Sequence, residues 1–538
     1  MPKFPLVLGA AAAGAIALGG IMQTAKDSRD EGARAAERHS SQFGYFLAMQ
    51  HAIHVDDFES APVFAEKLAD VDLGAVKTNI AVGLFLAGQL NSSAAHLSGD
   101  TNVTARIAHA SWLVHNDDWR AVREIYKDND SFLLAPLRIW SGIATRYITQ
   151  TLRFVDSLPH SDNWKHFMRG MIFVETNRFE QARQEFAKVP ADFMNLNDFM
   201  YVMAFYTHAG FDEDAKDLWD EFTAKPSGLY MINHTDLPDF SHFSGFRNAF
   251  AFNMIQSVSH SPFLSMTSIA LLLLRAAEAA APSDALNYYL GSFFYDNDSP
   301  QYADYFAKIP ENSPFRPFIM LKAAERATTQ RQMVRELERT ARANPLFLPA
   351  VVRLVNADLQ NGGYRRALNR IDSALRQDGI TDSAQALLLT LRARANRQSG
   401  NLKKAQNDIL LAADILPGTP AVLSEQAKIW TLSKNNLADA YAFAMALVKK
   451  YPADIDAWAT MAMVVREREG ASEALMILER IGRVAETNSL LFELLGDAQM
   501  ETGNRIRAVE SYRRAIELSD DGLTNLRALN RKLRRAKR

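Results

Sequence analysis

The 538-residue chain contains no cysteine. This absence excludes disulfides, zinc sites built on thiolates, cysteine nucleophiles and a lipid anchor on an N-terminal cysteine. A chain without cysteine is compatible with oxidising and with reducing compartments, so the absence does not assign a location.

Recognisable catalytic motifs are also missing. The sequence has no phosphate-binding G-x-x-x-x-G-K-[ST] loop, no G-x-S-x-G elbow, no H-E-x-x-H helix and no EF-hand loop. Its glycine-rich stretch, from Gly9 to Gly20, lies within an apolar leader. We therefore predict that the protein is not an enzyme and needs no cofactor.

A large excess of one charge is absent, since the formal net charge is −2. Residues 331–538 nevertheless carry 33 Lys and Arg against 24 Asp and Glu. Seven of these basic residues fall in the last twelve positions: Arg527, Arg531, Lys532, Arg534, Arg535, Lys537 and Arg538. Basic charge concentrated in a tail does not predict a nucleic-acid-binding surface.

The segment 521–538 also has a helical apolar pattern. Leu526, Leu529 and Leu533 are spaced three and four residues apart among the basic residues. A repeat array needs a terminal helix with one apolar and one polar face, so we predict a capping helix here. Attraction to anionic lipid headgroups or to an acidic partner is the alternative.

Long apolar runs are scarce, and the clearest one extends from Phe4 to Met22. As a helix it would be about 28 Å long, close to the thickness of the hydrocarbon core of a membrane. We predict that residues 1–24 form a membrane anchor or a signal peptide, either of which would place the rest of the chain on the periplasmic side of the inner membrane. A buried N-terminal helix of a cytoplasmic protein is the third possibility.

What the sequence does contain is a repeat of about 34 residues over 331–520. An alanine marks each of five units: Ala367, Ala405, Ala440, Ala474 and Ala508. Apolar or small residues recur in register sixteen positions before each alanine, and four and seven positions after it. Asn or Gly lies in each intervening turn. This spacing predicts two antiparallel helices per unit, with the alanine at the start of the second helix, where its small side chain allows close helix packing.

The last unit carries the pattern most fully, through Phe492, Leu495, Gly496, Ala508, Tyr512 and Ala515. In these positions the chain resembles the tetratricopeptide repeat family, although Gln499 replaces the expected aromatic residue. The resemblance implies an all-α fold, an α-solenoid wound as a right-handed superhelix.

A second likeness concerns the C-terminal part. A unit with Leu290-Gly291 and Ser313-Pro314, followed by five units that end in Leu495-Gly496-Asp497-Ala498, is similar to alphaproteobacterial envelope-associated tetratricopeptide proteins. That similarity implies a bacterial envelope setting. It implies no defined biochemical role.

The pattern divides the chain into six segments. We expect the N-terminal leader at 1–24, degenerate repeats at 40–225, an irregular helical interruption at 226–283, one repeat with a linker at 284–330, five repeats at 331–520 and the capping helix at 521–538.

The interruption contains two candidate sites. His234, Asp236, Asp239 and His242 could hold a divalent metal, although an exposed loop between repeats explains the same residues. Phe240, Phe243, Phe246 and Phe250 have the spacing of one helical face. These side chains could bind a partner, or they could pack against the neighbouring repeats.

Together these features predict a non-enzymatic scaffold of the bacterial cell envelope that holds a partner protein or peptide in its superhelical groove and contacts the membrane through its N-terminal segment. Candidate groove residues on first helices are Arg353, Arg392, Arg394 and Arg466. The alternatives are a metal-binding or enzymatic protein centred on residues 234–242, and a cytoplasmic tetratricopeptide adaptor or co-chaperone.

Overall fold

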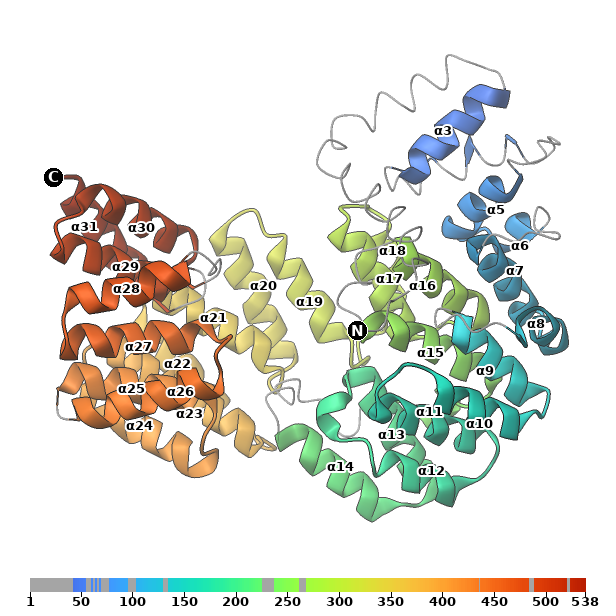
Figure 1. Cartoon of the computed structure of the whole chain (residues 1–538), viewed down its shortest axis with the longest axis horizontal. Coiled ribbons are helices and arrows are strands. Elements are labelled where there is room, and N and C mark those ends of the chain that lie inside the picture. Colours follow the sequence, from blue (N-terminus) through green and yellow to red (C-terminus); the bar gives the residue numbers. More distant parts are fainter. Residues whose placement is uncertain are drawn as a thin grey trace, which may run out of the picture. The chain divides into compact units, whose positions relative to one another are not determined.

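The computed structural model describes residues 42–54, 60, 63–64, 67–68, 77–94, 103–128, 134–224, 237–260, 268–434, 436–482, 488–519 and 523–538. In these ranges all regular structure is helical, as the repeat pattern predicted (Figure 1). The predicted leader, residues 1–24, lies outside the described residues. Within them, no helix is long and apolar enough to cross a membrane.

The chain forms two compact units, which are described separately. The N-terminal unit comprises residues 1–216 and 237–315, and the C-terminal unit comprises 217–236 and 316–538. The helices of the N-terminal unit are α3 (Gln42–His54), α5 (Lys77–Leu86), α6 (Leu90–Ala94), α7 (Val103–His115), α8 (Trp119–Tyr126), α9 (Ala135–Ala144), α10 (Ile148–Ser157), α11 (Asp162–Glu175), α12 (Phe179–Phe186), η3 (Ala191–Phe193), α13 (Leu196–Ala209), η6 (Phe240–His242), α15 (Phe246–Ser259), α16 (Ser268–Ala280), α17 (Asp284–Asp296) and α18 (Tyr302–Ala307). Helix α14 (Asp212–Ala224) crosses the boundary between the units.

Helices α5 to α12 of the N-terminal unit follow one another as antiparallel pairs, each packed on its neighbour in sequence. The predicted interruption then returns to this array, because α15 packs on α9 and α16 packs on α7 and α5. Side chains of α15 also bond to α11 and α13: Asn253 Nδ2 donates to Met168 Sδ at 3.2 Å, and Gln256 Nε2 donates to Asp198 Oδ1 at 3.0 Å. The helices α7, α9, α11 and α13 are therefore covered by a later part of the same chain.

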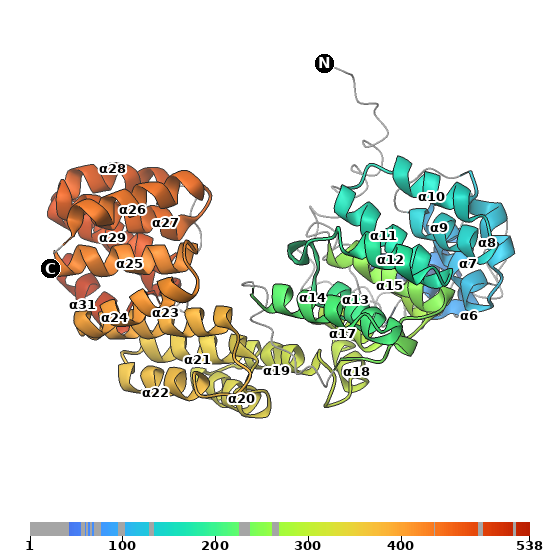
Figure 2. The ribbon, with the colours of Figure 1, turned by 90° about the horizontal axis from the view of Figure 1, so that it is seen from below.

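The C-terminal unit contains the five strong repeats. Its helices are α19 (Arg316–Glu325), α20 (Gln330–Ala343), α21 (Leu348–Gln360), α22 (Tyr364–Ala374), α23 (Asp382–Gln398), α24 (Leu402–Ile415), α25 (Pro420–Ser433), α26 (Leu437–Lys450), α27 (Ile455–Arg468), α28 (Ala471–Gly482), α29 (Ser489–Glu501), α30 (Arg505–Glu517) and α31 (Leu526–Lys537). Consecutive helices pack on each other, and Figure 2 shows α24, α26 and α28 following one another in the stack.

Each first helix of a repeat also packs on the first helix of the next repeat, from α21 through α23, α25 and α27 to α29. This extra contact places the first helices in a shared inner layer of the C-terminal unit. The second helices, α22 to α30, flank them.

The repeat alanines lie where the two helices of a pair approach most closely. Each alanine is the fourth residue of its second helix, so that helix begins three residues earlier than predicted. None of the five alanines has any exposed surface. Glycines with positive φ follow most of the first helices, as Gly400 (φ +86°) and Gly503 (φ +86°) illustrate, whereas Lys434 (φ +56°) ends α25. A residue without Cβ adopts this conformation without strain. The predicted helix–turn–helix architecture is confirmed.

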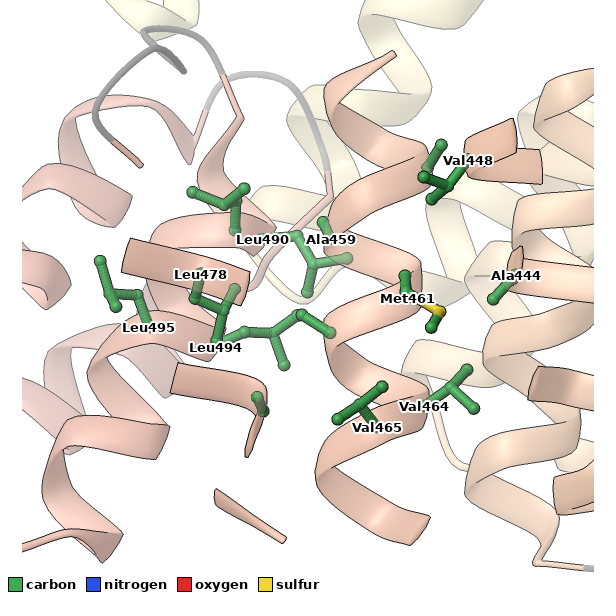
Figure 3. Packing of buried hydrophobic residues seen from close by; sticks show 14 of the residues in the cluster. Ala444, Val448, Ala459, Met461, Val464, Val465, Leu478, Leu490, Leu494 and Leu495 are labelled. Atoms are coloured by element: carbon green, nitrogen blue, oxygen red, sulfur yellow. The ribbon is translucent and has the colours of Figure 1, made fainter. Parts of the chain in front are cut away.

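The core between repeats is built from small and branched side chains. Figure 3 shows Met461, Val464 and Val465 of α27 between Ala444 of α26 and Leu478 of α28. All five side chains are buried. This packing continues the hydrophobic core from one repeat to the next, as expected for a solenoid.

Candidate protein-interaction groove

The inner layer of the C-terminal unit lines an open pocket of about 1010 Å³. Its walls are the C-terminal parts of α23, α25 and α27, the N-terminal and middle part of α29, and one face of α31. Lining residues include Arg397, Leu432, Met463, Arg466, Glu493, Asp497, Arg527, Arg531, Lys532 and Arg534. We call this pocket the C-terminal groove.

Helix α31 forms one wall because it packs on α30. Leu529 and Ala536 are buried against that helix, and Leu533 is partly buried beside them. Asn525 begins α31 as its N-cap, accepting the backbone N–H of Ala528 at 3.0 Å. Leu526–Lys537 thus form a helix whose polar side is turned into the groove, and its role as a cap of the repeat array stays a prediction.

The segment before α31 closes one end of the groove. Asn525 Nδ2 donates to the hydroxyl of Tyr364 at 3.1 Å, and Gln398 Nε2 donates to the carbonyl of Leu523 at 2.9 Å. Tyr364 begins α22 and Gln398 ends α23, so the last repeat is tied to the first two repeats. Such contacts fix the width of the groove.

The carboxylates of the groove already have basic partners. Lys532 Nζ donates to Glu493 Oε1 at 2.6 Å and to Asp497 Oδ2 at 2.7 Å. Arg466 lies 3.3 Å from Asp497 and also pairs with Glu501. Burial raises the pKa of Glu493, and the Lys532 ammonium offsets only part of that effect.

Ion pairs also join successive first helices, and one of their members, Arg397, lines the groove. Arg397 of α23 pairs with Glu425 of α25, and Lys428 of α25 pairs with Asp456 of α27 at 2.7 Å. Burial by itself would raise the pKa of Asp456, but Lys428 and the hydroxyl of Ser424 lower it to about 2. These pairs set the spacing of successive first helices.

Three arginines of α31 differ from these paired groups. Within the described residues, Arg527, Arg531 and Arg534 make no bond to a carboxylate, and all three are exposed. Arg534 donates only to the backbone carbonyl of Asn530, at 3.2 Å. The concentration of basic residues in the sequence indicated this cluster but did not place it in the groove.

The four arginines proposed from the sequence lie in ion pairs of the C-terminal unit. Arg353 pairs with Glu325 at 2.6 Å, and Arg392 bridges Asp372 and Asp408 at 3.0 and 2.7 Å. Of the four, only Arg466 lines the groove. Arg394 has a longer contact of 3.8 Å with Glu425. Partner binding by these side chains stays a prediction.

The four phenylalanines lie within the N-terminal unit. Phe240 begins the short 3-10 helix η6, Phe243 is its C-cap, and α15 begins only at Phe246, so the four do not share one continuous helix. Phe240, Phe243 and Phe250 are buried. Tyr201 contacts the first two rings. These contacts correspond to the alternative in which the phenylalanines pack against the neighbouring repeats. Partner binding through the four phenylalanines stays a prediction.

The proposed metal cluster is only partly described. Asp239 accepts the backbone N–H of Ser241 at 2.8 Å, and His242 Nδ1 lies 3.1 Å from the carbonyl of Asp239. His234 and Asp236 lie outside the described residues. Within the part of the chain that the structure describes, no three His, Asp or Glu side chains form a potential metal site.

Comparison with known proteins agrees with the repeat geometry. Residues 491–521, which span α29 and α30, match the family model of the tetratricopeptide repeat. The chain carries tetratricopeptide repeats. A comparison with curated protein sequences finds no match.

Solved structures also align with the chain, at low sequence identity. A tetratricopeptide repeat protein from Parabacteroides merdae is 13% identical with a TM-score of 0.32, over 55% of this chain and 100% of its own. Yeast Tom70 is 12% identical with a TM-score of 0.30, over 92% of this chain and 96% of its own.

Proposed function

We propose that the protein is a scaffold that holds a segment of a partner protein in the C-terminal groove. Tetratricopeptide arrays present an inner surface of first helices, which is the surface that lines this groove. The observation that carries the proposal is the groove itself: about 1010 Å³, open to solvent, with apolar and charged side chains side by side.

The two units support different roles. In the N-terminal unit, α15 and α16 pack on the first helices α7, α9, α11 and α13, so the chain itself covers them. In the C-terminal unit the corresponding helices α23 to α29 still border an accessible pocket. We therefore assign partner binding to the C-terminal unit.

Site-specific photocrosslinking in cells tests this assignment. Leu432 lines the groove and is 41% exposed, whereas Met445 on the outer helix α26 is 43% exposed and does not line it. A photoreactive residue at Leu432 should give a discrete partner adduct, and the same residue at Met445 should not. Equal adducts from both positions, or none from Leu432, would contradict the proposal.

We further propose that the scaffold works in the bacterial cell envelope, with its repeats on the periplasmic side. The support is the apolar run from Phe4 to Met22 and the similarity to envelope-associated tetratricopeptide proteins. A C-terminal tag should be lost when protease is added to spheroplasts, while a cytoplasmic control survives. A protected tag would instead favour the cytoplasmic adaptor.

A further inference from the structure

The arginines of α31 form a single charged face. Arg527, Arg531 and Arg534 are spaced four and three residues apart, which places them on one side of the helix. Leu529 and Ala536 occupy the opposite side and are buried against α30. The helix is thus held with its arginine face in the wall of the groove.

The carboxylates that the structure describes near this face do not neutralise it. Lys532, which has two bonds to Glu493 and Asp497, already satisfies those groups. The third acidic side chain of the pocket, Glu467, lies 3.5 Å from Lys434. Among the described side chains that line the groove, six are basic and three are acidic, so positive charge is in excess.

Apolar surface lies in the same pocket. Leu432 is an exposed large hydrophobic side chain, and Met463 and Leu494 lie near it in the lining. A simple anion would leave this surface in contact with water. A ligand that carries both carboxylates and an apolar side chain would cover it and meet the arginines at once.

We propose that the C-terminal groove binds an acidic segment of a partner protein, with carboxylates on Arg527, Arg531 and Arg534 and an apolar side chain on Leu432. This proposal rests on the proposed function and adds the chemistry of the partner. Along α31, the first and last of these arginines are about 10 Å apart. Successive arginines are about 4.5 to 6 Å apart along the helix and an extended chain advances about 3.3 Å per residue, so acidic residues about two positions apart would meet successive arginines.

Binding of two labelled peptides to the full chain, followed by fluorescence anisotropy, tests the proposal. One peptide is extended and carries three Glu residues and one Leu between Ser and Gly; the other has Gln in place of each Glu. We expect the acidic peptide to bind at least roughly tenfold more tightly, and this preference to shrink as the salt concentration rises, because exposed charges are screened.

Matched variants locate the effect. R527Q/R531Q/R534Q should abolish the preference for the acidic peptide. R480Q/R505Q/R513Q removes the same charge from exposed arginines of the outer helices α28 and α30, and it should leave the preference unchanged. The single variant R531Q leaves two arginines in place, so it should lose only part of the preference for the acidic peptide. This variant tests the proposal even if the triple variant folds poorly.

Three results would overturn the proposal: equal binding of both peptides, an equal loss in both triple variants, or displacement of the acidic peptide by a single-stranded oligonucleotide that binds more tightly. If the Leu432 crosslink persists in any of these cases, the groove still holds a partner but does not select acidic residues. If neither peptide binds and the Leu432 crosslink is also absent, the proposed function fails as well.

Discussion

The carboxylate of Glu175 accepts the backbone N–H of Gly245 through both oxygens, at 3.1 and 3.0 Å. Glu175 ends α11 and Gly245 directly precedes α15, so this bond ties the start of α15 to the N-terminal array. His260, the C-cap of the same helix, pairs with the buried carboxylate of Asp198 at the start of α13. Two titratable groups therefore hold the two ends of α15.

The stability of the N-terminal unit should fall as the pH rises from about 4.5 to 7. Burial raises the pKa of Glu175 from 4.5 in the unfolded chain to about 7 in the folded protein. The unfolded chain therefore loses this proton at a lower pH, and the ionisation of Glu175 favours unfolding between pH 4.5 and 7. Burial lowers the pKa of His260, but the hydrogen bond and the charge of Asp198 together raise it above its usual value, so the stability that this pair contributes is lost as the pH rises through the raised pKa.

Denaturant unfolding of the wild type and of E175Q at several pH values measures this effect. The carboxamide keeps an acceptor for Gly245 without a charge, so E175Q should lose the fall between pH 4.5 and 7. At pH 8 it should be more stable than the wild type by roughly 2 kcal/mol, after allowance for solvent screening. Parallel curves for both proteins would show that Glu175 does not control this dependence.

Gly496 illustrates how the close packing of a helix pair depends on one missing side chain. A Cβ at this position would lie 2.7 Å from the ring of Tyr512, whose hydroxyl donates to Asp497 at 2.8 Å and cannot easily move. G496A should destabilise the C-terminal unit by about 1–3 kcal/mol. G482A is the control: its Cβ would meet the nearest atom at 3.5 Å, so thermal unfolding should change little.

The sequence predicted this part of the fold because its determinants are local. Ala508 and Tyr512 lie four residues apart on one helix, and their contacts with the preceding helix recur in each repeat. The placement of α15 was not predictable in this way. Its bonds to α11 and α13 join residues separated by 58 to 85 positions, such as Gln256 with Asp198 and Asn253 with Met168, and no period marks them.

The candidate site was predictable only in outline. The basic character and the helical spacing of Arg527, Arg531 and Arg534 were visible in the sequence. Their position in the groove depends on how the array curves back to Tyr364. By contrast, Arg392 and Arg466 are paired with acidic residues 16 to 35 positions away, and a single sequence does not indicate which arginines are paired.

Lys428 should be more important for stability than its charge alone suggests. It is 1% exposed and contacts both oxygens of Asp456, at 2.7 and 2.8 Å. K428M leaves that carboxylate without its cation and should cost about 3–5 kcal/mol. The double variant K428M/D456L removes both charges and should recover much of the loss in a double-mutant cycle.

The pH dependence of this ion pair has the opposite sign to that of Glu175. The pKa of Asp456 falls from 3.8 to about 2 on folding. The stability that this ion pair contributes is therefore complete above pH 4 and is lost as the pH falls toward 2. Unfolding of the wild type and K428M at pH 7 and pH 3 should show a difference that shrinks in acid. A constant difference would mean that packing, rather than charge, accounts for the effect.

Gly362 should control how tightly the last repeat is tied to the first. Its φ is +69°, and a Cβ would lie 2.9 Å from Asn525 Nδ2, the atom that donates to Tyr364. G362A therefore adds backbone strain and disrupts the bond that closes the groove.

G400A is the control, because it adds the same kind of strain at φ +86° with nothing within 4 Å of the new Cβ. G400A should lose about 1 kcal/mol of stability from strain alone, and G362A should lose more, because the hydrogen bond is lost as well. Amide hydrogen exchange should accelerate around Leu523 to Ala528 only in G362A, and the acidic peptide should bind that variant more weakly. Equal exchange in the two variants would mean that the tie between Asn525 and Tyr364 does not hold α31 in place.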